Sequence, residues 1–96
     1  PKLPNSLEIL VCDNNNLRQL PKLPESLKYL FCENNNLNQL PKLPESLKFL
    51  SCSNNNLPYT NLQEYKKYIE KYKDLIDKYG YNEAMNLLNN TNKYNI

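Results

Sequence analysis

Several absences in the sequence narrow its function. Histidine is absent, and no apolar run approaches the roughly 20 residues that a transmembrane helix needs. The 96 residues are enough for one small domain, and 12 basic against 10 acidic residues leave a net charge of only +2. Residues 1–57 and 58–96 each carry six basic and five acidic residues, so neither half is a basic arm or an acidic tail. The charge pattern therefore predicts neither a nucleic acid nor a membrane as partner.

The sequence also shows no signal peptide and no initiator Met. Asn89-Asn90-Thr91 fits the glycosylation sequon, but one tripeptide in an Asn-rich tail is weak evidence for secretion. Glycine occurs once, while Asn, Lys and Tyr are abundant. That bias is typical of an AT-rich genome.

The three cysteines, Cys12, Cys32 and Cys52, recur at one fixed spacing. An odd number of cysteines in a regular series does not look like a disulfide framework. The pattern predicts reduced thiols and a location in the cytoplasm, including that of a host cell, or inside a virion. Without His, the chain offers neither a mixed metal site nor a base to activate a thiol. We expect no cofactor, no bound metal and no enzymatic activity.

An internal repeat is the strongest positive signal. Residues 1–60 fall into three 20-residue lines, which read PKLPNSLEILVCDNNNLRQL, PKLPESLKYLFCENNNLNQL and PKLPESLKFLSCSNNNLPYT. Each line carries the pattern L-x-x-L-x-L-x-x-N-x-L with Cys in the third apolar slot. The pattern predicts a leucine-rich repeat solenoid of the α/β class, with a parallel β-sheet on the concave face, an extended polyproline-like convex side and a C-terminal helical cap.

Each part of the pattern has a physical role. Alternation over 29–33 predicts a strand with Leu30 and Cys32 inward and the residues between them outward. The Asn ladder, which comprises Asn15, Asn35 and Asn55, is expected to satisfy backbone groups where the chain leaves the sheet. The Pro-rich return segments are expected to run extended and to point leucines inward at positions 20, 23, 40 and 43.

We expect three repeats over 1–20, 21–40 and 41–57, followed by a helical cap over 58–96. Because Pro1 is in phase with Pro21 and Pro41, the array is expected to continue upstream; a tolerated open N-terminus is the alternative. In the cap, one helix is expected at about 61–79 and a shorter one at about 83–89, with fraying from about Asn89.

The first cap helix rests on an apolar stripe at three- and four-residue steps: Leu62, Tyr65, Ile69, Tyr72, Ile76 and Tyr79. Thr60 with Gln63 fits a capping box, and Gly80 fits a C-terminal stop. The stripe is interpreted as covering the last repeat. An amphipathic helix that docks a partner or a membrane is the alternative, although acidic residues dilute its lysines.

The L-P-x-L-P-x-x-L-x-x-L-x-C-x-x-N-x-L line resembles the short leucine-rich repeats of bacterial secreted effectors, and is similar to repeat proteins encoded by giant DNA viruses and amoebae. The resemblance covers residues 1–57. It implies protein binding through the concave face and favours a giant virus as the source of the sequence. It does not imply the ubiquitin-ligase activity of some effectors, because no Cys follows Cys52 and the tail is too short for that domain.

Up to Leu57, the second and third repeats differ only at 29/49, 31/51 and 33/53, which are outward strand positions. The outward set predicted to bind a partner is Ile9, Val11, Asp13, Tyr29, Phe31, Glu33, Phe49, Ser51 and Ser53. Exposed clustered aromatics mark interaction sites. Drift after duplication, and simple pairing of side chains across strands, would leave the same pattern.

Two functions follow from this surface. The first is a protein–protein interaction module whose protein partner, of unknown identity, binds the concave face. The second is a structural or assembly component of a larger multi-protein particle. Three strands give a face of only roughly 10 by 13 Å, well below the roughly 800 Å² per partner of a standard interface. More repeats must extend it, or its binding is weak.

Overall fold

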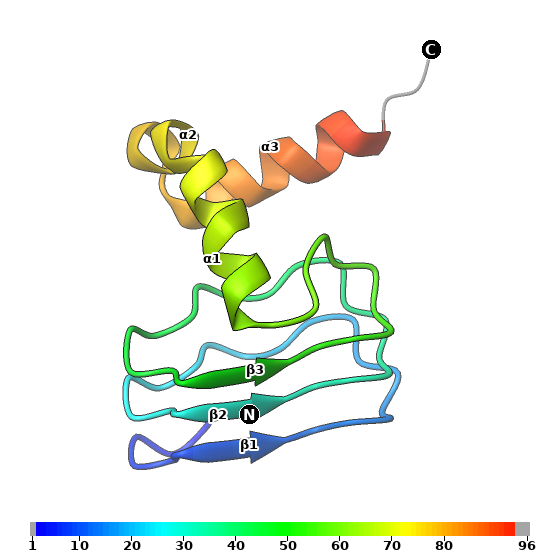
Figure 1. The fold of residues 1–96 in the computed structure, drawn as a ribbon, viewed down its shortest axis with the longest axis vertical. Coiled ribbons are helices and arrows are strands. Elements are labelled where there is room, and N and C mark those ends of the chain that lie inside the picture. The colour runs from blue at the N-terminus through cyan, green and yellow to red at the C-terminus, as the bar shows by residue number, and fades with distance from the viewer. Residues whose placement is uncertain (1, 94–96) are drawn as a thin grey trace.

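Three short strands precede three helices in the computed structural model, which describes residues 2–93 and the side chains of residues 2–89. The strands are β1 (Ile9–Val11), β2 (Tyr29–Phe31) and β3 (Phe49–Ser51). The helices are α1 (Leu62–Lys71), α2 (Lys73–Tyr79) and α3 (Tyr81–Lys93) (Figure 1).

The strands form one parallel sheet in the order β1-β2-β3. Leu10 pairs with Leu30, and Leu30 pairs with Leu50, so each strand is in register with its copy 20 residues later. Leu30 and Leu50 are almost completely buried, while Tyr29 and Phe49 are exposed. The parallel register and the inward and outward alternation are as the sequence predicts, but the strand predicted over 29–33 is shorter, since β2 ends at Phe31.

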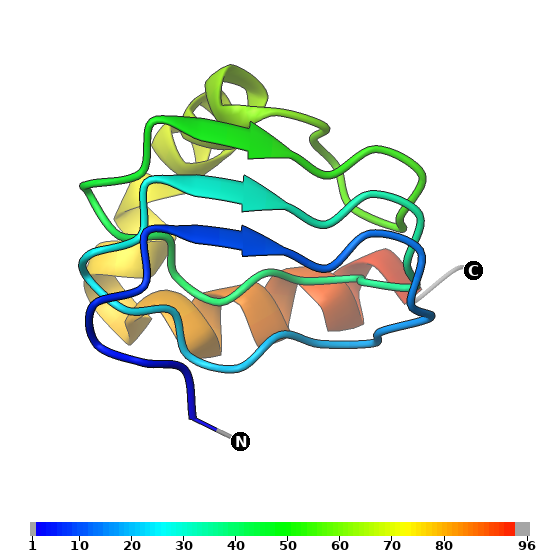
Figure 2. The same ribbon diagram turned by 90° about the horizontal axis from the view of Figure 1, so that it is seen from below.

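The predicted curved leucine-rich repeat solenoid is wrong. The described residues form a small compact α/β domain, with a Cα radius of gyration of 13.4 Å, close to the roughly 13 Å of a compact domain of 100 residues. Strands of three residues and three chain turns are too few to develop a superhelix. The helices take up more of the chain than the strands, and they fold back over the end of the sheet and its return side (Figure 2).

One hydrophobic core runs through the stacked chain turns. Leu27, Leu30, Leu37 and Leu40 are fully buried at its centre. The return segments add the leucines at positions 20, 23, 40 and 43, all buried as expected. Around the first chain turn, Leu3, Leu7, Leu10, Cys12 and Leu17 pack against this core but are only partly buried.

The expected helix over about 61–79 is divided in two at Tyr72, whose φ of −108° and ψ of 22° depart from helical values. The main-chain N–H of Tyr72 is shared between the carbonyl oxygens of Tyr68 and Ile69, at 3.3 and 3.2 Å. The second expected helix, over 83–89, is longer than predicted, since α3 runs from Tyr81 to Lys93. Tyr79, expected in the buried stripe, is exposed.

The predicted capping box is displaced by one residue. Asn61, not Thr60, is the N-cap of α1, because its Oδ1 accepts from the main-chain N–H of Glu64 at 2.9 Å. Glu64, not Gln63, reaches back and accepts from the main-chain N–H of Thr60 at 2.8 Å. Thr60 is used differently: its carbonyl oxygen accepts from the N–H of Cys52, which holds the start of α1 beside β3.

Gly80 ends α2, as expected. Its φ of 83° and ψ of 162° lie in a region that only glycine adopts readily, and its N–H donates to the carbonyl oxygen of Ile76 at 2.7 Å. The turn allows α3 to pack Ala84 and Met85 against α1 and α2. Tyr81 then anchors α3 to the sheet domain, since its buried hydroxyl donates to the Leu40 carbonyl oxygen at 2.6 Å.

Candidate binding surface

The outer sheet face, which consists of the outward side chains of the three strands, carries four of the six large hydrophobic side chains that are exposed among the described residues. Ile9, Tyr29 and Phe49 form one column across the paired strands, and Val11, Phe31 and Ser51 form the next. Val11 is 63% exposed and Ile9 is 54% exposed. None of the helices lies over this face, because α1 sits beyond β3 at one end of the sheet (Figure 1).

Two aromatic rings of the outer sheet face contact each other. The ring centroids of Phe31 and Phe49 are 5.3 Å apart with an interplanar angle of 40°. Part of the aromatic surface is therefore used in cross-strand packing. A hollow of about 410 Å³ lies beside Phe49, between β3 and the start of α1, and is also lined by Leu50 and Leu62. A protruding side chain of a partner could enter this hollow next to the exposed aromatic ring.

The predicted acidic edge of the surface is largely occupied by contacts within the chain. Asp13 Oδ1 accepts from the main-chain N–H of Glu33 at 2.6 Å. Glu33 Oε2 accepts a short hydrogen bond from the hydroxyl of Ser51. Asp13, Glu33 and Ser53 are all half-buried at the ends of the strands. These two carboxylates continue the hydrogen bonding between chain turns beyond the sheet, so they are less available to a partner than the sequence suggests.

The Asn ladder lies just beyond this edge and has the predicted structural role. Asn35 Nδ2 donates to the carbonyl oxygens of Cys12, Cys32 and Glu33, at 3.0, 3.1 and 3.2 Å. Its Oδ1 accepts from the main-chain N–H groups of Asn15 and Leu17, at 2.9 and 3.0 Å. One side chain therefore satisfies five main-chain groups on two adjacent chain turns.

Asn55 repeats this arrangement one turn later. Its Nδ2 donates to the carbonyl oxygens of Cys32 and Cys52, at 3.0 and 3.1 Å, and its Oδ1 accepts from the N–H of Leu37 at 3.0 Å. Asn15 Nδ2 donates to the carbonyl oxygens of Cys12 and Asp13. The ladder holds the backbone that presents the outer sheet face.

The asparagines that flank the ladder have a role that the sequence reasoning missed. Asn14, Asn34 and Asn54 all have positive φ, at 62°, 59° and 58°. Asparagine tolerates this left-handed conformation better than other residues with a Cβ. The repeated triplet NNN could have indicated it, because only the central Asn is needed for the ladder.

Ser26 and Ser46 form a second hydrogen-bonded series that was also missed. The Ser26 hydroxyl lies 2.7 and 2.6 Å from the carbonyl oxygens of Asn5 and Leu7 in the preceding chain turn. Ser46 is placed in the same way against Glu25 and Leu27. The signal in the sequence was a serine at the same position of every 20-residue line.

The three thiols are free and chemically quiet. Burial raises the pKa of Cys52 to about 12, helped by the nearby carboxylates of Glu64 and Glu33. Burial also raises the pKa of Cys32, and that of Cys12 is raised by burial and by Asp13. A thiol with a raised pKa is protonated at neutral pH and is a poor nucleophile. Cys12 is half-buried and the other two are buried.

Residues 2–93 contain neither a cluster of metal-binding side chains nor a helix that could cross a membrane. No three or more His, Cys, Asp or Glu side chains of this part of the chain converge in a way that could hold a metal ion. In the same residues, every helix is too short or too polar to span a bilayer.

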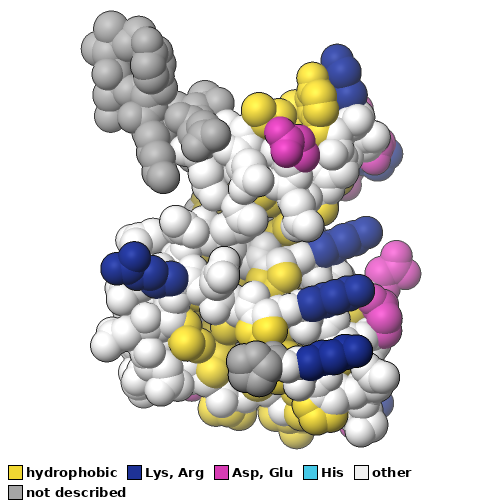
Figure 3. Space-filling model, turned by 180° about the vertical axis from the view of Figure 1, so that it is seen from behind, with side chains coloured by type: hydrophobic (Ala, Val, Ile, Leu, Met, Phe, Trp, Pro, Cys, Tyr) yellow, Lys and Arg dark blue, Asp and Glu magenta, His cyan; other side chains and the backbone are white. Residues whose placement is uncertain are grey.

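The return side, opposite the outer sheet face, has a different character. Basic side chains project from it in a column (Figure 3). Lys22 and Lys42 line one hollow there together with Glu25 and Glu45, so the charge is mixed. Hydrophobic side chains are visible between these basic residues as well (Figure 3), so the return side is a mixed surface without the aromatic column of the outer sheet face.

The chain matches no family model, and no significant similarity to a curated protein or a solved structure is found. The resemblance to short repeats of bacterial effectors and giant viruses therefore stays a prediction from the motif alone.

Proposed function

We propose that this protein binds a protein partner through the outer sheet face and carries out no catalysis of its own. The observation that supports the proposal is the exposure of four apolar side chains on adjacent strands of one sheet, namely Ile9, Val11, Tyr29 and Phe49. Aromatic side chains contribute strongly to protein interfaces and lose little conformational entropy on binding.

The position of the sequence differences agrees with this proposal. Up to Leu57, the second and third 20-residue lines share their buried leucines and their Asn ladder. They differ there only at 29/49 and 31/51, which are outward positions of β2 and β3, and at 33/53, just beyond the strands. A scaffold that is kept while one face changes is expected of a surface whose chemistry is adapted to a partner. The small area of three strands favours a weak interaction, or one in which the hollow beside Phe49 receives an anchoring side chain.

The test is a photo-crosslinking experiment in cells. A photoreactive amino acid at Val11, on the outer sheet face, is compared with the same amino acid at Glu45, an exposed residue of the return side. We expect crosslinks to a specific partner from Val11 only, and their loss when Tyr29, Phe31 and Phe49 are changed to Ala. If the purified partner binds the triple variant with unchanged Kd, the proposal is wrong.

A role as an assembly component of a larger particle is the second candidate. In that case, the contacts would use the helices, where Tyr79 is 46% exposed. Deleting residues 59–96 does not test this role, because Tyr59, Tyr65 and Tyr81 are part of the core and their loss would unfold the domain. Tyr79→Ser keeps the core intact. Loss of assembly in this variant, with normal assembly in the outer-face triple variant, would favour the second candidate.

We propose that the protein is located in the cytoplasm, including that of a host cell, or in the interior of a virion. The support is that Cys12, Cys32 and Cys52 are all free, which is typical of a reducing compartment.

A further inference from the structure

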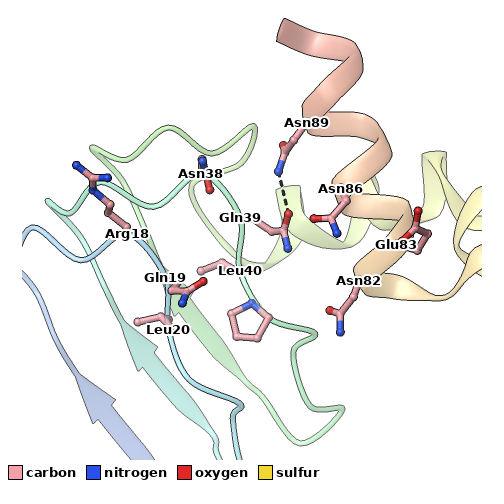
Figure 4. A pocket seen from close by; sticks show the side chains of 11 residues that line it. Arg18, Gln19, Leu20, Asn38, Gln39, Leu40, Asn82, Glu83, Asn86 and Asn89 are labelled. Atoms are coloured by element: carbon pink, nitrogen blue, oxygen red, sulfur yellow. Dashed lines mark hydrogen bonds between the residues drawn. The ribbon is translucent and has the colours of Figure 1, made fainter. Parts of the chain in front are cut away.

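A polar cleft separates α3 from the return segments of the first two chain turns, well away from the outer sheet face. Its volume is about 650 Å³, within the range of roughly 300–1,000 Å³ that is typical of ligand sites. One wall comes from residues 18–20 and 38–41, and the other comes from α3 (Figure 4). The cleft therefore exists only because α3 folds back beside the sheet domain.

The lining of the cleft is unusually rich in primary amides. Six of its side chains are carboxamides, namely Gln19, Asn38, Gln39, Asn82, Asn86 and Asn89. Leu20, Leu40 and Pro41 also line the cleft. Each carboxamide can donate and accept hydrogen bonds without carrying charge.

Helix α3 divides its residues between the core and the cleft. Ala84 and Met85 are buried against α1 and α2. Asn82, Asn86 and Asn89 follow one another at steps of four and three residues, which places them on a single helix face toward the cleft (Figure 4). Asn89 Nδ2 donates across the cleft to Gln39 Oε1 at 2.8 Å. The two walls are thus within hydrogen-bonding reach at one end.

Two charged side chains of opposite sign complete the lining. Arg18 lies on the first chain turn and Glu83 on α3, and Figure 4 shows both at the outer ends of the lining, turned away from the carboxamides at its centre. The carboxamides therefore set the chemistry of the cleft, which favours an uncharged ligand with alternating hydrogen-bond donors and acceptors. No aromatic ring lines the cleft among the described residues, so it lacks the stacking surface that would favour a sugar or a nucleobase.

The protein already shows how its carboxamides recognise a peptide main chain. Asn35 uses both amide atoms to bind carbonyl and N–H groups of the neighbouring chain turn, at 2.9 to 3.2 Å. The amides of the cleft present the same atoms toward open space. We propose that this cleft binds a short extended peptide, holding its main-chain N–H and carbonyl groups with Gln39, Asn82 and Asn86.

The experiment is an NMR titration of the full ¹⁵N-labelled chain with the tetrapeptide serylalanylserylalanine. We expect saturable shifts of the side-chain NH₂ signals of Gln39, Asn82 and Asn86, with a Kd on the order of 1 mM. The N82A/N86A variant should bind at least tenfold more weakly. Both residues are exposed, so that variant should fold normally, as its main-chain amide spectrum would show. Gln63→Ala, which removes an exposed carboxamide from α1, is the matched control and should bind as the parent chain does.

Two further probes define the chemistry. The same tetrapeptide with an acetylated N-terminus and an amidated C-terminus should bind with a similar Kd, because the carboxamides contact the main chain and not its ends. A linear glucose tetrasaccharide should cause no saturable shift. The proposal is overturned if the free tetrapeptide gives no saturable shift, if N82A/N86A binds it like the parent chain, if the blocked form fails to bind, or if the sugar binds in its place.

Discussion

The side-chain Nδ2 of Asn35 donates to the carbonyl oxygen of Cys12, 3.0 Å away and 23 residues earlier in the chain. The same group also donates to Cys32 in its own chain turn, at 3.1 Å. Asn35 therefore adds a side-chain link between two chain turns just beyond their strands, where main-chain hydrogen bonds such as that from the Asn14 N–H to the Glu33 carbonyl oxygen also join them. Contacts of this kind help to hold the chain turns that carry the outer sheet face in register.

Replacing Asn35 with Ala should destabilise the domain strongly. The change removes five hydrogen bonds and takes away the acceptor of the part-buried main-chain N–H groups of Asn15 and Leu17. The carbonyl oxygens of Cys12, Cys32 and Glu33 each keep a second donor. We expect a loss of about 3 kcal/mol in the free energy of unfolding. Urea denaturation followed by circular dichroism measures it. The control is Asn36→Ala, whose side chain is exposed and which should change stability by less than about 0.5 kcal/mol. Equal losses in the two variants would contradict the ladder's structural role.

Gly80→Ala should be destabilising although the new methyl group has room. No heavy atom lies within 4 Å of the place that a Cβ would take, so steric overlap is not the reason. The reason is the backbone, because φ of 83° with ψ of 162° costs a residue with a Cβ about 1–3 kcal/mol. Thermal denaturation should show a lower Tm, and Lys78→Ala on exposed α2 should leave it nearly unchanged. An unchanged Tm for the Gly80 variant would mean that the turn relaxes at little cost.

Stability should fall as the pH rises from about 9 to about 12, partly because of Cys52. Its pKa is raised from the ordinary 9.0 to about 12 in the folded state, so the unfolded chain loses this proton first. The folded state then binds more protons than the unfolded state, and its stability decreases with pH across this window. In Cys52→Ala, the decrease in the free energy of unfolding between pH 9 and 12 should be shallower. Comparing the slopes of the free energy of unfolding against pH removes the constant destabilisation caused by the smaller side chain. Identical slopes in the parent chain and the variant would contradict the raised pKa of Cys52.

Phe31 and Phe49 should be energetically coupled, but their loss should not unfold the chain. Their rings are in contact at 5.3 Å, and Phe49 is 45% exposed. A double-mutant cycle with Phe31→Ala and Phe49→Ala should give a coupling of about 0.5–1.5 kcal/mol. Val11 and Phe49 lie on β1 and β3, which are not neighbours in the sheet, and the same cycle should be additive. Global unfolding of the Phe31/Phe49 double variant would show instead that these rings belong to the core.

The parts of the fold that repeat every 20 residues could be predicted from the sequence, because each position is specified three times. Leu10, Leu30 and Leu50 pair as the period requires, and the Asn ladder makes the bonds expected of it. The overall architecture could not be predicted in this way. A local pattern specifies one chain turn, whereas the final shape depends on how few turns there are and on where the helices pack.

The helical part shows the limit of periodicity. The apolar stripe continues through Tyr72, so the spacing alone gives no sign that the helix is divided there. The cleft beside α3 was equally hidden, since Gln39 and Asn89 are 50 residues apart and belong to different kinds of structure. At the outer sheet face, the sequence placed the aromatic residues correctly, but it did not show that Asp13 and Glu33 bind within the chain.

The different burial of the three thiols provides a built-in set of reporters for partial opening of the domain. Cys12 is half-buried on the first chain turn, whereas Cys32 is enclosed between its neighbours and Cys52 donates to the Tyr59 carbonyl oxygen beneath the start of α1. A thiol-specific reagent should therefore label Cys12 first. Labelling of Cys52 would report detachment of the segment that leads into the helices, so the order of modification would reveal from which end the molecule comes apart.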